Sequence, residues 1–118
     1  ELDEYKYGSP TQTRVFDIRD IGNAILFHDY FGPTNAIDHN GYVNGTVFYL
    51  ANYSAGFRAI DLSNLAEKEM SETGFFDTYP NDDATDFTGV WNVYPYFKSG
   101  VILISDINSG LFLVKASN

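Results

Sequence analysis

The sequence has no cysteine, one methionine and one tryptophan, and only two of its 118 residues are histidines. The lack of cysteine excludes disulfide bonds and thiolate zinc sites, and it is compatible with either side of a membrane. No apolar run approaches the roughly 18 residues that a membrane-spanning helix needs, and no signal peptide opens the chain. We therefore predict no membrane insertion. Because the first residue is Glu1, we expect either a processed protein or a piece of a longer one.

Basic residues are also scarce. Seven lysines and arginines stand against sixteen aspartates and glutamates, so the formal net charge is −9. A field of this sign repels phosphate groups. The charge balance therefore argues against nucleic acids and anionic membranes as partners.

Motifs that signal catalysis are missing as well. The sequence contains no G-x-S-x-G elbow, no phosphate-binding glycine loop and no H-E-x-x-H zinc motif. A carboxylate pair for glycoside hydrolysis stays open, because any two of the sixteen acidic side chains could meet in space. We predict a chain that is not an enzyme and carries no cofactor.

The sequence does contain an internal repeat. A shift of 54 positions aligns residues 46–63 with residues 100–117 without a gap. A shift of 44 aligns residues 13–20 with residues 57–64, and a shift of 45 brings HDYFGP onto TGFFDT. Strand-rich repeats with a period near 40 to 50 residues are typical of β-propeller blades.

The repeated text has the pattern of a β-hairpin. VFYLANY and VILISDI are rich in β-branched and aromatic residues, as strands covered on both faces are. Each is followed by a polar stretch, NYSAG or DINSG, and then by a second strand. A tight antiparallel turn often needs positive φ, which Gly56 and Gly110 adopt at little steric cost.

We predict an all-β fold made of two four-stranded antiparallel propeller-type blades plus one leading strand, which is a partial β-propeller in a single domain over residues 1–118. Residues 13–20 are expected to form the last strand of a preceding blade. Blade 1 is predicted over residues 24–63 and blade 2 over residues 69–117. A short helical turn is expected within residues 64–70. Two units packed face to face as a small sandwich are the alternative.

The pieces GFFDTYP, GVWNVYP, SGVILISD and SGLFLVK occur in this order, and HNGYVNGTVFYLANYSAGFRAIDLSN precedes them. With these pieces the chain resembles the choice-of-anchor B family of bacterial surface or secreted proteins with LVIVD-type propeller repeats, over residues 14–115. The resemblance implies an extracellular or cell-surface location and the C-terminal blades of a larger propeller protein. It brings no catalytic residues.

Two blades and one strand leave open sheet edges, which must be paired, covered or charged. We therefore predict a protein partner at these edges, either a second copy of the chain or a parent or partner domain. The function that follows is a non-catalytic extracellular interaction or assembly module, and one specific form of it is a regulatory companion of a secreted protease. The alternative is a carbohydrate-binding or hydrolytic propeller whose site missing blades would complete.

Large side chains with a polar edge suit partly wet interfaces. Those near the expected innermost strands are the candidate interaction residues, namely His39, Tyr42, Trp91, Tyr94 and Tyr96. The run AIDHNG does not predict a catalytic triad, because neighbouring residues of a strand point to opposite faces.

Two stretches of the sequence are candidates for a calcium site. DINSG begins like a calcium loop, but LFLVK after it offers no bidentate carboxylate, so we predict a hairpin turn there. Asp82, Asp83 and Asp86 lie within five residues and are the stronger candidate for a cation. The interpretation that we favour for them is a solvated acidic loop, and no metal site is predicted.

Overall fold

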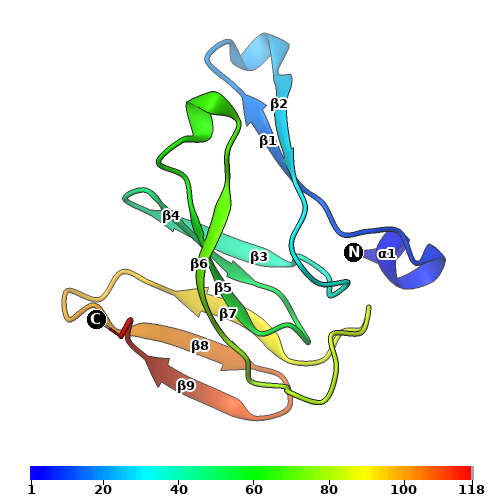
Figure 1. The fold of residues 1–118 in the computed structure, drawn as a ribbon, viewed down its shortest axis with the longest axis vertical. Helices are drawn as coiled ribbons and strands as arrows, with labels where there is room; N and C mark the ends of the chain where they lie inside the picture. Colours follow the sequence, from blue (N-terminus) through cyan, green and yellow to red (C-terminus); the bar gives the residue numbers. More distant parts are fainter. Residues whose placement is uncertain (118) are drawn as a thin grey trace.

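The computed structural model describes residues 1–117, and these residues form strands joined by short turns (Figure 1). The strands are β1 (Thr13–Asp17), β2 (Ile25–Tyr30), β3 (Asn40–Asn44), β4 (Val47–Ala51), β5 (Phe57–Asp61), β6 (Ser71–Phe76), β7 (Val90–Tyr94), β8 (Ile102–Asp106) and β9 (Gly110–Val114). Helical structure in the described part is limited to α1 (Leu2–Tyr7) and two 3-10 turns, η1 (Ile21–Asn23) and η2 (Leu65–Glu67).

The strands form three antiparallel sheets. Sheet A has the order β1-β2, sheet B the order β3-β4-β5-β6 and sheet C the order β7-β8-β9. Sheet B lies between the other two, with sheet A above it and sheet C below it in Figure 1. The prediction of an all-β fold is confirmed.

The predicted grouping of strands into blades is wrong by one strand. Blade 1 was expected over residues 24–63, but β2 pairs with β1 and not with β3. Blade 2 was expected over residues 69–117, but β6 pairs with β5 and completes sheet B. The complete four-stranded sheet therefore runs from β3 to β6, and residues 13–20 lead into a pair of strands.

The connections explain this grouping. The link between β5 and β6 contains η2, which reverses the chain so that β6 returns beside β5. Longer segments, residues 31–39 and 77–89, separate β2 from β3 and β6 from β7. The repeat correctly indicated that β2 and β6 are alike. Each of them is the last strand of its sheet along the chain, whereas we predicted that each would be the first strand of a blade.

The two predicted hairpins are confirmed. β4 and β5 pair with Ala51 opposite Phe57, and β8 and β9 pair with Asp106 opposite Gly110. Gly56 and Gly110 have φ of 81° and 86°, as the turn chemistry predicted. The carboxylate of Asp106 accepts hydrogen bonds from the backbone N–H groups inside its own turn. DINSG is therefore a hairpin turn.

The main hydrophobic core lies between sheets B and C. Its buried members come from both sheets, and they are Ala51, Phe57, Val90, Val93, Ile102 and Ile104. A backbone bridge between Tyr53 and Val90 joins the two sheets at one end of this core.

Hydrogen bonds around Asp38 link sheet A to the segment that leads into sheet B. The hydroxyl of Thr13 donates to the carboxylate of Asp38 over 2.6 Å, and the backbone N–H of Asp38 donates to the hydroxyl of Thr11 over 2.8 Å. The side-chain amide of Asn52 donates to the same carboxylate. Among the described residues, no helix is long and apolar enough to cross a membrane.

Candidate functional site

The predicted interaction residues come together on or next to the innermost strands of sheets B and C: Tyr42 lies in β3, Trp91 and Tyr94 lie in β7, His39 precedes β3 and Tyr96 follows β7. The ring centroids of His39 and Trp91 lie 4.4 Å apart, and those of Tyr42 and Tyr96 lie 6.0 Å apart in an edge-to-face arrangement. Tyr94 contacts Tyr96 with its ring 5.4 Å away. We call these five residues the aromatic surface.

A β-bulge places two of these rings on one face. The pairing of β7 with β8 skips Trp91, which is the extra residue of the bulge. In a regular strand Trp91 and Tyr94 would point to opposite faces, because they lie three positions apart. The bulge shifts the alternation, so that both rings are exposed while Val90 and Val93 are buried. Bulges often redirect a side chain in this way next to functional sites.

The exposed rings border a shallow pocket of about 240 Å³. Tyr42, Trp91 and Tyr94 supply its aromatic wall, and Asn92 and Ser105 supply polar groups. Tyr96 contacts the rings of Tyr42 and Tyr94. Its hydroxyl donates to the backbone carbonyl of Val43 over 2.9 Å. The pocket thus combines partly exposed rings with a few hydrogen-bonding groups.

His39 contacts Tyr53 and Glu1, and its side chain is 14% exposed, which makes it the least exposed member of the aromatic surface. Its ring stacks on Tyr53, with centroids 4.6 Å apart, and the Tyr53 hydroxyl lies 3.1 Å from Nδ1. The carboxylate of Glu1 contacts the same nitrogen. Burial raises the pKa of Tyr53 to about 12, so its hydroxyl keeps its proton at neutral pH. The neighbouring carboxylate of Asp38 accepts hydrogen bonds from Thr13 and Asn52.

Some contributors to this site carried no sequence signal. Tyr53 lies in the NYSAG turn with φ of 39°, and it reaches the site because its backbone bridges to β7. Tyr5 of α1 packs on Phe87, which in turn contacts Tyr53. Only the meeting of α1 with sheets B and C brings these rings together.

The acidic loop does not assemble a cation site. Asp82 and Asp86 accept hydrogen bonds from the backbone N–H groups of Ala84 and Phe87, which are ordinary contacts of turns. Within residues 1–117 the structure brings together no group of three or more side chains that could hold a metal ion. Asp82, Asp83 and Asp86, named as the stronger calcium candidate, are not part of any such group.

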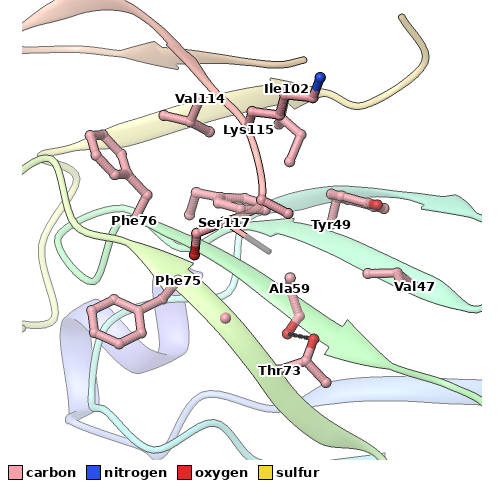
Figure 2. Close-up of a pocket in the computed structure, with 13 residues that line it drawn as sticks. Val47, Tyr49, Ala59, Thr73, Phe75, Phe76, Ile102, Val114, Lys115 and Ser117 are labelled. Atoms are coloured by element: carbon pink, nitrogen blue, oxygen red, sulfur yellow. Dashed lines mark hydrogen bonds between the residues drawn. The ribbon is translucent and has the colours of Figure 1, made fainter. Parts of the chain in front are cut away.

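A larger cavity lies on the other side of the sheets. It has a volume of about 450 Å³ and lies where sheets B and C separate (Figure 2). One wall includes Tyr49, Phe57 and Phe76 of sheet B, the other includes Ile102 and Val114 of sheet C, and residues 115–117 after β9 also line the cavity. We call this cavity the strand groove.

The strand groove exists because sheet C has one strand fewer than sheet B. In sheet B, β6 pairs along the outer edge of β5. In sheet C, the equivalent edge of β9 has no neighbouring strand among residues 1–117. The β6 residues Gly74 and Phe76 therefore face an open space where a fourth strand of sheet C would lie.

Comparisons with protein-family models, with curated proteins and with solved structures each found no match. The resemblance to the choice-of-anchor B family stays a prediction, and the site rests on its own geometry.

Proposed function

We propose that this chain is a non-catalytic protein-interaction module that accepts an extended segment of a partner protein as a fourth strand along β9. In line with the family resemblance, we propose an extracellular or cell-surface location for it. The observation that carries the proposal is that no strand within residues 1–117 pairs with the outer edge of β9, which lies beside the apolar strand groove.

Strand addition suits the edge of β9. The sequence of β9, GLFLV, contains no proline and no charged residue, which are the features that block pairing at an edge. Main-chain hydrogen bonds from such an edge give affinity to an added strand, and pockets for its alternate side chains give specificity.

The chain itself contains the template for the added strand. β6 pairs antiparallel with β5, with Phe76 opposite Phe57 and Gly74 opposite Ala59. By the repeat, β9 takes the place of β5, so the partner segment is expected to run antiparallel to β9. The partner's inward side chains would contact Tyr49, Phe57 and Phe76 in the groove, and they are therefore expected to be apolar.

The experiment uses a synthetic peptide with the sequence of residues 69–78, which contains β6. We expect titration of this peptide to shift the NMR signals of the β9 amides and of the groove residues. A second peptide with the same sequence, methylated at the backbone nitrogens of alternate residues, cannot complete the hydrogen bonds and is expected not to bind. Shifts confined to other regions would contradict the proposal.

A substitution that fills the groove gives a sharper test. A Cβ built on Gly74 meets no heavy atom within 4 Å, so Gly74→Phe is expected to fold and to place its ring in the groove. We expect this variant to bind the peptide at least about tenfold more weakly, which corresponds to about 1.4 kcal/mol. Gly32→Phe is the matched control, because Gly32 is equally open and lies outside the groove. Equal affinity for both variants would exclude the groove as the binding site.

A further inference from the structure

Sheet C exposes the face that sheet B buries. In sheet B, the residues that pack towards sheet C are Tyr49, Ala51, Phe57 and Ala59. The shift of 54 positions places Leu103, Ser105, Leu111 and Leu113 at the same points of sheet C. The strand register agrees, because Leu103 pairs with Leu113 and Ser105 pairs with Leu111, as Tyr49 pairs with Ala59 and Ala51 with Phe57.

The exposure of these equivalent residues differs sharply. Phe57 is 5% exposed, whereas Leu111 and Leu113 are 63% and 65% exposed. Trp91 and Tyr94 of the aromatic surface are also exposed, and they line a pocket with Leu103 and Ser105 of this face. Sheet C therefore carries an apolar face of the kind that is covered by another sheet elsewhere in the same chain.

Sheet A shows the complementary situation at the other end of the molecule. The shift of 44 positions places Arg14 and Phe16 at the points of Arg58 and Ile60 in sheet B. Ile60 is fully buried, whereas Phe16 is 48% exposed and its partner on β2, Leu26, is 47% exposed. The face of sheet A that carries Phe16 therefore corresponds to the face of sheet B that buries Ile60, but in sheet A this face is exposed.

These two faces are the two halves of one kind of interface. Inside the chain, sheet B turns the face that carries Phe57 and Ala59 towards sheet C. Sheet C meets it with the opposite set of positions, which includes Phe112 and Val114, the equivalents of Arg58 and Ile60. In sheet C, the face equivalent to that of Phe57 and Ala59 is free. In sheet A, the face equivalent to that of Arg58 and Ile60 is free.

We propose that the chain associates head to tail with a second copy, in which the Phe16 face of sheet A covers the Leu111 and Leu113 face of sheet C. This contact goes beyond the proposed strand addition, since it uses a different surface and a different partner. Because the two halves are different patches, one copy keeps a free half after each contact, and association continues into a ring or a filament. The pocket of the aromatic surface lies at the border of this contact.

The test separates the two halves by substitution. Leu113→Glu places a charge on the sheet C face, and Phe16→Glu places a charge on the sheet A face. Both side chains are exposed, so both variants are expected to fold. In sedimentation and light scattering over a concentration series, the unmodified chain is expected to exceed the mass of one copy, 13.2 kDa. Each variant alone is expected to associate at least about tenfold more weakly.

Mixing the two variants gives the decisive result. Each variant keeps one intact half, so an equal mixture is expected to form a complex of two chains and nothing larger. Leu2→Glu is the control for adding a charge at an exposed apolar position outside both faces. A chain that stays a single copy at every concentration, or a mixture that stays unassociated, would overturn the proposal.

The peptide of residues 69–78 distinguishes this proposal from the proposed function. The Phe16→Glu variant leaves β9 unchanged, so normal peptide binding by this variant together with loss of association would support the head-to-tail contact and confirm that the variant is folded. Association that is unchanged in both variants would overturn the head-to-tail contact, whether or not the peptide binds. If the unmodified chain associates but does not bind the peptide, only the proposed strand addition is overturned.

Discussion

Asp38 is the side chain that ties sheet A to sheet B, and its ionisation is coupled to folding. Burial raises its pKa above the ordinary value of 3.8, while the hydrogen bonds from Thr13 and Asn52 act in the opposite direction. The folded chain therefore binds this proton more tightly than the unfolded chain. The stability from this difference is fully present below about pH 3.8 and is lost as the pH rises through the raised pKa.

Asp38→Asn removes this titration. We expect the free energy of unfolding of the variant, minus that of the unmodified chain, to increase with pH above about 3.8. Urea unfolding followed by the fluorescence of Trp91, the one tryptophan, measures both values. Asp83→Asn in the exposed acidic loop controls for the loss of a carboxylate. A difference that stays constant with pH would show that Asp38 does not titrate differently in the folded state.

Gly89 governs how two elements, the NYSAG turn and β7, approach each other. It has φ of 91°, and a Cβ added there would lie 2.3 Å from the backbone oxygen of Tyr53. The bridge between Tyr53 and Val90 requires this close approach. A side chain at position 89 would therefore force sheets B and C apart at the end of their shared core.

Gly89→Ala tests this joint. Gly110→Ala is the matched control, because Gly110 has φ of 86° and no heavy atom within 4 Å of an added Cβ. The control is expected to lose about 1 kcal/mol from backbone strain alone. Gly89→Ala is expected to lose at least about 2 kcal/mol more, because backbone atoms must move. Thermal and urea unfolding measure both losses of stability. Equal losses would mean that the backbone around Gly89 and Tyr53 can move apart at little cost in free energy.

Over the whole molecule, stability is expected to be uneven. Sheets B and C share a buried apolar core, whereas Tyr30 is the one buried residue of β1 and β2, and hydrogen bonds around Asp38 link β1 to the segment that leads into sheet B. Regions with few buried apolar contacts open at lower free energy than the core. We expect the amides of β1 and β2 to exchange hydrogen through local opening, before those of β4, β5 and β8.

Native-state hydrogen exchange resolved by residue measures this. In increasing urea, the protection of β1 and β2 is expected to fall at concentrations where β8 is still protected. Asp38→Asn at neutral pH provides a second perturbation of the same contact. If all the strands lost protection together, sheet A would be part of one cooperative unit with the core.

Several features were predictable because they depend on neighbours in the chain. The two hairpins, whose turns end at Gly56 and Gly110, follow from runs rich in β-branched and aromatic residues and from turn chemistry. The interaction residues were chosen as large amphipathic side chains near the innermost strands, and the structure places them side by side. The predicted turn within residues 64–70 is present as η2, whereas α1 was not predicted.

The sequence by itself determined the all-β class, the hairpins and the likeness of β2 to β6, because strand propensity and turn geometry act over a few residues. Tertiary structure alone decided which strands share a sheet, since a strand pairs with whichever edge its connection lets it reach. It also decided the bulge at Trp91, the bridge at Tyr53 and the strand groove. These features arise where separate sheets meet, and the pattern of a single strand carries no information about the sheet that will cover it.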